Sequence, residues 1–588
     1  MKTANDIFRI LTVAPSLIQI EVLDVDKFKE DTVDFTIGSY LKISDDTNTS
    51  IIALVQSFKI KETNNGGETE VTTPSFILDA QPIGFLDDKG EFKRGGQQIA
   101  IPPNDVSIAD ASILKSIYDS IDQEKKFIFS ELAQNNAIDI AVDGDKFFSK
   151  HIAVVGSTGS GKSGTVAKIL QEGIRPGTAQ KEKGILNNTH ILLFDLHGEY
   201  NKAFPLSINL NVNNLVLPYW LMNSEELEEM FIESNENNSH NQISQFRYAV
   251  IQNKKKHNPT VTNPSYDSPL YFSLIEVLNF ITNLNNEIVG KAIGEDARPK
   301  LSDGTLIDDR CQYYFDSIKT FVVSSQAAAT KASNGPFNGE FDRFVMRLGT
   351  KINDERLSFL LKPIKEDGTE YKTTDFSDIL KSFIGYSTDK KNNITIIDLS
   401  GIPFEVLSVV VSLINRLVFD FCFYYKMTKK ENEESPISVV LEEAHNYSPQ
   451  SEGAKYRAVK KSIERIAKEG RKYGLSLMIV SQRPSEISET IFSQCNNFVA
   501  MRLTNPTDQQ YVKRLMPDSV SAITDTLPVL ERQEALIIGD SIPIPTIVLI
   551  KDLVDKPDSN DINFRTEWKK DWVDVTFDSL IKKMKKEE

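Results

Sequence analysis

The stretch HIAVVGSTGSGKSGTVAKIL, residues 151–170, decides the fold of this chain. It joins an apolar run to a glycine-rich loop, GSTGSGKS at residues 156–163, and the loop to a stretch with the composition of a helix. The loop matches the phosphate-binding pattern G-x-x-x-x-G-K-[ST] in full, and a strand before it and a helix after it are the context that this pattern requires. The sequence therefore predicts a nucleotide-binding α/β domain built around this loop.

The residues of the loop have separate predicted roles. Its glycines let backbone N–H groups point at phosphates, Lys162 neutralises the β- and γ-phosphates of ATP, and the Ser163 hydroxyl ligates Mg²⁺. A glycine-rich turn that contains Lys-Ser by chance is the alternative, and the flanking pattern argues against it. ATP and Mg²⁺ are thus the predicted cofactors, and the predicted nucleotide-binding residues are Gly156, Ser157, Thr158, Gly159, Ser160, Gly161, Lys162, Ser163 and Gly164.

A second apolar run, residues 437–441, ends in the two carboxylates Glu442 and Glu443. Because successive side chains of a strand point to opposite faces, one carboxylate can lie beside Mg²⁺ and the other beside the attacking water. We assign Glu442 to the metal and Glu443 to the activation of water. Aspartate is usual at the first of these two positions. The side chain of Glu442 is longer, so Glu442 is expected to reach the metal through a water molecule. Two solvated carboxylates at a strand end are the alternative.

Composition and pattern along the chain predict a multidomain protein. Short strand-like runs up to residue 110 are typical of a small β-barrel, and apolar runs that alternate with helical stretches after residue 150 are typical of a mostly parallel sheet. We predict, in order, a barrel at 1–110, a connector at 111–145, the first part of the ATPase core at 146–204, a helical insertion at 205–391, the second part of the core at 392–550, and a tail with a helix at 551–588.

Charge and cysteine usage narrow the functional class. The net charge of −16 excludes a uniformly basic surface but not a local basic channel. Cys311, Cys422 and Cys495 have no metal-ligand spacing and suggest a reducing cytoplasm. The longest apolar stretch, residues 406–424, is interrupted by polar residues and is expected to be a buried helix, so no membrane association is predicted.

Five segments resemble the HerA family of DNA translocases, in the FtsK–HerA branch of P-loop ATPases. The resemblance covers most of the predicted core and implies a RecA-like fold, a homo-hexamer and double-stranded DNA as the substrate. Lys150 stands where many relatives carry Arg. The segments are SKHIAVVGSTGSGKS at 149–163, FDLHGEY at 194–200, TIIDLSGIPFEVLSVVVSLINRLVF at 395–419, LEEAHNYSP at 441–449 and IAKEGRKYGLSLMIVSQRPSEI at 466–487.

The resemblance also implies roles for three residues near the last of these segments. Gln482 is placed like the sensor of the γ-phosphate. Arg471 is placed like the catalytic arginine that stabilises the transferring phosphoryl group, and Arg465 is the second candidate. Either arginine could act in its own chain or on a neighbouring one, and a surface or salt-bridge role is the alternative for each.

A basic helix is predicted at residues 455–473, where eight basic residues accompany two glutamates. At 100° per residue its cations fall on one stripe opposite an apolar face. Such a stripe can contact DNA phosphates without reading bases, and we assign this role to Arg457, Lys461 and Lys468. A solvated basic face is the plainer alternative.

The leading functional hypothesis is an ATP-driven hexameric DNA translocase or helicase. A kinase or GTPase would also have a phosphate loop but needs no carboxylate pair followed by a sensor strand, whereas an ATP-binding scaffold ring without translocation stays open. HerA relatives work beside a nuclease or another effector, in DNA-end processing or anti-phage defence. We therefore expect a separate effector partner, with the predicted barrel as its docking surface.

Overall fold

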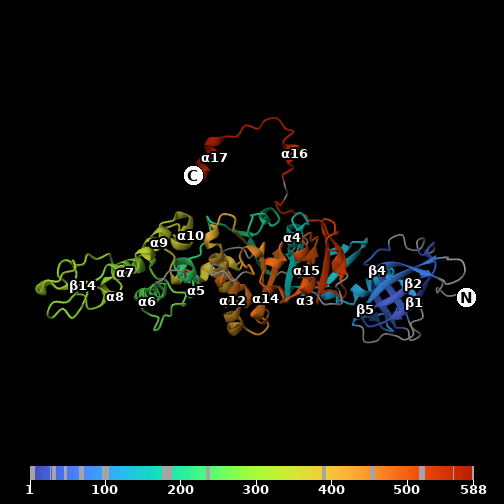
Figure 1. Ribbon diagram of the computed structural model, residues 1–588, viewed down its shortest axis with the longest axis horizontal. Coiled ribbons are helices and arrows are strands. Elements are labelled where there is room, and N and C mark those ends of the chain that lie inside the picture. The colour runs from blue at the N-terminus through green and yellow to red at the C-terminus, as the bar shows by residue number, and fades with distance from the viewer. Residues whose placement is uncertain are drawn as a thin grey trace.

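The computed structural model describes residues 7–26, 28, 35–44, 49–64, 72–95, 105–174, 188–233, 239–386, 392–450, 457–515, 523–559 and 562–585. The molecule is elongated, with a small β-sheet domain at one end, a helical region at the other and a large α/β body between them (Figure 1). The α/β body therefore separates the β-sheet domain from the helical region, and it contains the glycine-rich loop.

A mixed sheet of eleven strands forms the centre of the body. The strands are β8 (Lys126–Leu132), β9 (Asn135–Asp143), β10 (His151–Val155), β11 (His190–Asp195), β12 (Ile208–Leu210), β15 (Ile394–Asp398), β16 (Ile437–Leu441), β17 (Leu475–Ser481), β18 (Cys495–Met501), β19 (Glu534–Gly539) and β20 (Thr546–Ile550). Their order across the sheet is β12-β15-β11-β16-β17-β10-β18-β19-β20-β8-β9. Strands β12 to β18 pair in parallel and the rest pair antiparallel. The predicted α/β, RecA-like core is confirmed.

The ends of this sheet differ from the prediction. Residues 126–143, expected to lie in a connector, form β8 and β9, and β8 pairs with β20. Residues 208–210, expected to lie in the insertion, form the edge strand β12 beside β15. These three strands are short or irregular: β12 has three residues, and the β8–β9 pairing contains register shifts. Such strands have little period-two signal, which is why the sequence did not reveal them.

Three helices pack against the parallel part of the sheet and matter for the site: α4 (Lys162–Ile174), α12 (Phe404–Thr428) and α13 (Arg457–Glu469). Helix α12 is long and apolar enough, by length and composition, to cross a membrane, but 78% of its most apolar window is buried inside the protein. Leu413, Ile414 and Leu417 on α12 belong to the main hydrophobic core. The burial is that of a core helix, as the interrupted pattern predicted.

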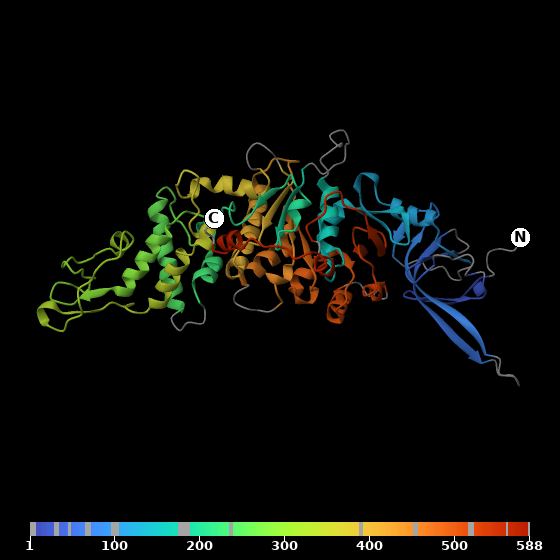
Figure 2. The same cartoon turned by 90° about the horizontal axis from the view of Figure 1, so that it is seen from above.

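The N-terminal domain is an antiparallel sheet around its own apolar core, which includes Ile20, Leu41 and Leu78. Its end strands, β1 and β7, approach each other, so the sheet curls. The long hairpin of β4 and β5 projects from this domain (Figure 2). The strands are β1 (Phe8–Val13), β2 (Ile18–Val22), β3 (Tyr40–Ser44), β4 (Ser50–Asn64), β5 (Thr72–Leu86), β6 (Phe92–Arg94) and β7 (Asp105–Ile108).

The insertion is mostly helical and is fixed to the core by a buried ion pair. Glu226 is fully buried and accepts a hydrogen bond from Arg416 of α12 at 2.9 Å. Glu226 also accepts from the Ser412 hydroxyl at 3.0 Å, so both partners of the pair are well bonded. The insertion contains α5 (Ser224–Phe231), α6 (Ser239–His257), α7 (Leu274–Asn286), α9 (Asp342–Ile352), α11 (Phe376–Phe383) and a two-stranded sheet of β13 (Ile288–Gly290) and β14 (Ala332–Asn334).

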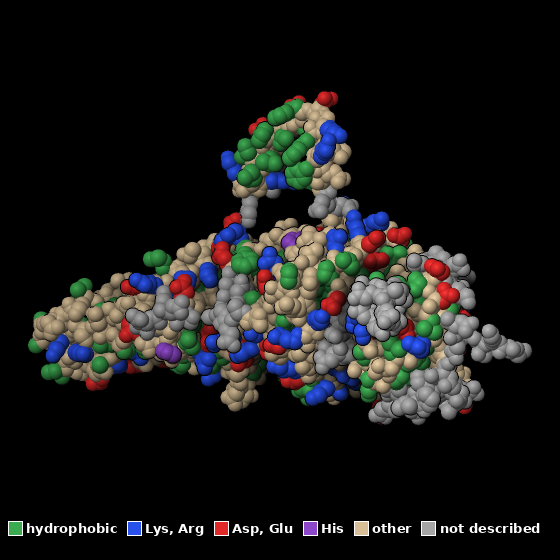
Figure 3. All heavy atoms as spheres, turned by 45° about the vertical axis from the view of Figure 1, so that its right-hand side comes forward, with side chains coloured by type: hydrophobic (Ala, Val, Ile, Leu, Met, Phe, Trp, Pro, Cys, Tyr) green, Lys and Arg blue, Asp and Glu red, His purple; other side chains and the backbone are tan. Residues whose placement is uncertain are grey.

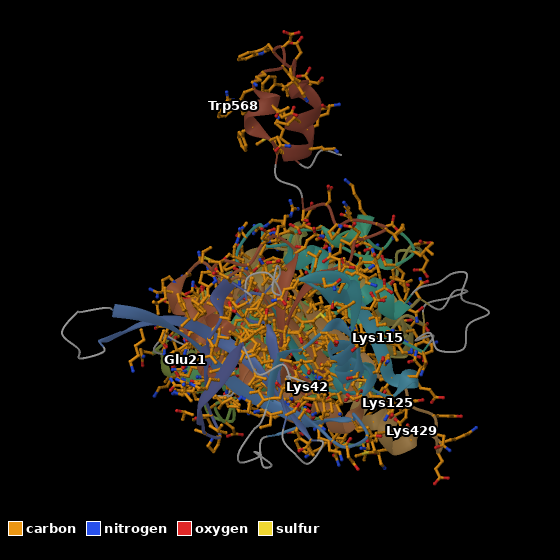
Figure 4. All side chains as sticks on the ribbon, turned by 90° about the vertical axis from the view of Figure 1, so that its right-hand side faces the viewer. Glu21, Lys42, Lys115, Lys125, Lys429 and Trp568 are labelled. Carbon is orange, nitrogen blue, oxygen red and sulfur yellow. The ribbon has the colours of Figure 1, made fainter. Side chains whose placement is uncertain are left out.

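The C-terminal segment with α16 (Phe564–Glu567) and α17 (Phe577–Lys585) stands away from the body (Figures 1 and 4). Its aromatic side chains are exposed, Trp568 to 78% and Trp572 to 95%. Figure 3 shows a patch of hydrophobic side chains on this segment. These aromatic side chains are therefore not buried against the described part of this chain.

Candidate nucleotide site

The glycine-rich loop lies between β10 and α4, at the carboxyl ends of the parallel strands. Gly159 and Gly161 have φ angles of 75° and 104°, which residues with a side chain rarely adopt. A Cβ at Gly156 would lie 2.9 Å from the Cβ of Met501, closer than packed carbon atoms allow. The glycines thus have the conformations and the close packing that the phosphate-binding pattern requires.

Three strand ends hold the loop by backbone hydrogen bonds. Ser157 N–H donates to the Arg502 carbonyl at 2.7 Å, after β18, and Gln533 N–H donates to the Ser160 carbonyl at 3.0 Å, before β19. Gly156 N–H donates to the Ser481 carbonyl at 3.3 Å, at the end of β17. Sequence reasoning missed Arg502 and Gln533, because only the order of strands in the sheet brings them to the loop.

Lys162 is buried beside the carboxylates. Its ammonium group donates to the Ser157 carbonyl at 3.5 Å. Burial lowers the pKa of Lys162, and the nearby Glu443, Glu442 and Glu199 oppose that shift. The surrounding carboxylates therefore favour the positive charge that a phosphate would neutralise.

Glu442 and Glu443 follow β16 and are 3% and 7% exposed. Burial raises the pKa of Glu442 well above its usual range, and the nearby charges of Asp195, Glu199 and Glu443 raise it further. Glu443 has a left-handed backbone conformation, with φ at 46°. One oxygen of each side chain, Oε2, is buried without a hydrogen-bond partner among the described residues. Buried carboxylate oxygens without partners are unfavourable unless a cation or a water molecule occupies the site.

These residues fit a magnesium–nucleotide complex. Among the described residues, no group of three or more His, Cys, Asp or Glu side chains is arranged to hold a metal ion by itself. Mg²⁺ in nucleotide sites is bound by one or two carboxylates, phosphates and water, so a cluster of three side chains is not needed. Ser163 and Glu442 are the residues that would hold it, as the sequence predicted.

Asp195 and Glu199, in the segment after β11, complete the carboxylate set. Asp195 is fully buried and accepts backbone hydrogen bonds from His197, Gly198 and Tyr200, between 2.9 and 3.3 Å. Glu199 is half-buried, and burial raises its pKa while the hydroxyl of Ser163 within hydrogen-bonding reach lowers it. The loop that Asp195 shapes thus places Glu199 beside the predicted metal ligand.

The sensor prediction for Gln482 agrees with its position. Thr158 Oγ1 of the phosphate loop donates to Gln482 Oε1 at 2.6 Å, so the amide lies at the loop. His445 Nδ1 lies 3.3 Å from Glu443 Oε2 and 3.2 Å from Ser481 Oγ, next to Gln482. Burial lowers the pKa of His445. His445 therefore connects the ends of the two strands that carry Glu443 and Gln482.

Comparison with known proteins agrees with this geometry. The family described as "Helicase HerA, central domain" matches residues 127–418. A DNA double-strand break repair helicase HerA of Sulfolobus acidocaldarius is 27% identical over 72% of this chain and 69% of its own length. That of Pyrococcus furiosus is 26% identical over 70% and 67%. The probable helicase MJ1565 of Methanocaldococcus jannaschii is 24% identical over 92% of this chain and 91% of its own length.

The chain is similar to the HerA family. It is therefore an ATP-hydrolysing enzyme, and the loop, carboxylates and sensor described above are its candidate catalytic site.

Arg471 of this HerA-like ATPase lies at the other edge of the sheet. With the first residues of β11, β16 and β17, it lines a cavity of about 740 Å³. The phosphate loop follows the last residues of the strands, and β17 has seven residues, so about 20 Å separate the two edges. Arg471 therefore lies too far from the phosphate loop of its own chain to contact a nucleotide there, and its role as the catalytic arginine stays a prediction.

Arg465 is better explained by packing than by catalysis. Its guanidinium carbon lies 4.1 Å from the centre of the Phe419 ring, and a guanidinium nitrogen lies 3.6 Å from Asp420. Both partners belong to α12, so the side chain joins α13 to α12. These contacts agree with the salt-bridge role given as the alternative, and a catalytic role for Arg465 stays a prediction.

The basic stripe on α13 is partly neutralised. Lys461 pairs with Glu225 of the insertion, and Lys468 pairs with Glu464 at 3.1 Å. Arg457 is exposed and has no acidic partner among the described residues. All three side chains still lie at the surface. DNA contact by Arg457, Lys461 and Lys468 stays a prediction, with less free positive charge than the sequence alone suggested.

Proposed function

We propose that this chain is an ATP-driven motor that moves along double-stranded DNA. The observation that carries the proposal is the division of the catalytic groups between two edges of one sheet. Lys162, Glu443 and Gln482 lie at the loop, whereas Arg471 lies at the opposite edge. A site whose arginine comes from another copy links hydrolysis to the arrangement of subunits, which is what a translocating ring requires.

The chemistry assigned to the chain is phosphoryl transfer to water. Mg²⁺, when bound with ATP, neutralises charge on the β- and γ-phosphates. Lys162 contacts the same phosphates from the loop, Glu443 accepts the proton of the attacking water, and Gln482 contacts the γ-phosphate. Arg471 of a neighbouring copy adds positive charge at the transferring group.

A closed ring, most simply a homo-hexamer, places every loop beside an Arg471. The relatives described above are DNA double-strand break repair helicases and a probable helicase, which supports double-stranded DNA as the substrate. Arg457, Lys461 and Lys468 are the proposed phosphate contacts.

A separate effector completes the proposed function. The groups described at the nucleotide site serve ATP hydrolysis, and we find no second catalytic constellation in the described part of the chain. Moving DNA therefore serves another protein, a nuclease or a different effector, in DNA-end processing or anti-phage defence. The N-terminal sheet domain is the proposed docking surface, since it lies at one end of the molecule, outside the ATPase body (Figure 1).

The test is steady-state ATP hydrolysis with and without double-stranded DNA at fixed ionic strength. Wild-type protein should hydrolyse ATP only with Mg²⁺, and duplex DNA should raise the rate several-fold. Lys162→Ala should weaken nucleotide binding and remove turnover, because it deletes the cation at the β- and γ-phosphates. Lys430→Ala, an exposed surface control, should behave as wild type. A DNA-independent rate would count against the motor and favour the scaffold ring.

A further inference from the structure

A strap of chain, residues 551–558, runs from β20 across the helix that follows the phosphate loop. Lys168 of α4 donates from Nζ to the Asp552 carbonyl at 2.8 Å. Leu553 packs against the start of the same helix, where a Cβ at Gly164 would lie 3.5 Å from its Cδ1 atom. The strap is thus fixed to the first part of α4 at two points, Gly164 and Lys168.

The strap also binds the segment that carries Glu199. The N–H of Asp558 donates to the Glu199 carbonyl at 2.8 Å, and the Asp558 carboxylate pairs with Lys202 at 2.6 Å. Gln171 of α4 donates from Nε2 to the carbonyls of Asp555 at 2.7 Å and Ala203 at 3.1 Å. One side chain therefore joins α4, the strap and the segment after β11.

The two acids in that segment have different surroundings. Both Asp195 oxygens already accept backbone N–H groups, so that side chain shapes the loop. The Glu199 carboxylate instead lies near the Ser163 hydroxyl and close enough to Lys162 to favour its charge. Glu442 Oε2, buried and without a partner in the described chain, faces the same group of charges.

We propose that Glu199 is a further positioning residue for magnesium, holding the ion's water on the Ser163 side, and that the strap keeps Glu199 there. This inference rests on the proposed Mg²⁺–ATP site. It would place two carboxylates, Glu442 and Glu199, at the ion, which matches the one or two carboxylates that Mg²⁺ keeps in phosphate-bound sites. Groups that hold metal-bound water through hydrogen bonds typically change metal affinity 10–100-fold when removed.

The direct test is Glu199→Gln, which preserves size and the ability to accept from Ser163 but removes the charge. Binding of a fluorescent ATP analogue is titrated with Mg²⁺, and the same binding is measured in EDTA. The Mg²⁺ concentration for half-maximal binding should rise about tenfold, with binding in EDTA unchanged. Glu433→Gln, an exposed glutamate far from the loop in sequence, is the matched control and should titrate as wild type.

The strap is tested by Gln171→Leu, which removes the hydrogen bonds to Asp555 of the strap and to Ala203 without changing the charge. It should shift the Mg²⁺ requirement in the same direction but less, and add little to Glu199→Gln in the double variant, because both act on one group. A Gln171→Leu protein with the Mg²⁺ requirement of the wild type would overturn the strap's role.

The possible results distinguish a failure of the Glu199 role from a failure of the proposed Mg²⁺–ATP site. A Glu199→Gln protein with wild-type Mg²⁺ dependence, or with equally weakened binding in EDTA, would overturn the role of Glu199. If wild-type protein bound the nucleotide with no Mg²⁺ dependence at all, the proposed Mg²⁺–ATP site itself would fail instead.

Discussion

Replacing Glu443 with glutamine is expected to lower ATP turnover by a factor of about 10² to 10⁴ while nucleotide binding persists. Glu443 is the carboxylate beside Lys162 whose Oε2 accepts no hydrogen bond from the described residues, so it can accept the proton of the attacking water. The amide has a similar size and cannot accept that proton. Steady-state phosphate release measures turnover, and titration with a fluorescent ATP analogue measures binding.

A control variant and a separate measurement of binding make this result specific to Glu443. Glu433→Gln should keep wild-type turnover, since this side chain is exposed and distant from the loop in sequence. Undiminished turnover in Glu443→Gln would remove Glu443 from the reaction. Loss of binding together with turnover would indicate a structural role, consistent with the left-handed backbone at this position.

Arg471→Ala is expected to lower turnover by a factor of about 10³ or more, because an arginine supplied to the transferring phosphoryl group contributes that much to kcat. Nucleotide binding by a single Arg471→Ala chain should not change, because Arg471 lies at the edge of the sheet opposite to that chain's own phosphate loop. Lys472→Ala, the exposed neighbour, is the control.

Mixing two inactive variants distinguishes action within a chain from action between chains. Arg471→Ala subunits retain an intact phosphate loop, and Lys162→Ala subunits retain Arg471. A junction between the two is complete if the arginine acts on a neighbouring copy, so mixed assemblies should regain part of the activity. Mixtures as inactive as each variant alone would contradict the divided site.

The local half of the site could be predicted from the sequence because it is encoded by contiguous patterns. The loop at 156–163 and the strand ending in Glu442 and Glu443 each combine a strand, its terminus and the functional residues in one short run. Parallel strands end at one edge of the sheet, so these groups, together with Gln482, meet once the α/β fold is recognised.

The remaining features depend on strand order and tertiary contacts. The edge on which Arg471 lies follows from the start of β17, and the packing of Arg465 follows from Phe419 and Asp420 on a different helix. The contacts of Arg502 and Gln533 with the loop arise across neighbouring strands. The strap joins Asp558 to Glu199 over 359 positions of sequence, a distance at which no periodic pattern operates.

If ATP hydrolysis moves this protein along duplex DNA, the protein should displace a third DNA strand bound to that duplex. With Mg²⁺ and ATP, wild-type protein should release the third strand much faster than the spontaneous rate, whereas Glu443→Gln protein, though still binding ATP, should not. DNA-stimulated ATP hydrolysis without any release of the third strand would contradict translocation and leave an ATP-binding assembly that does not move.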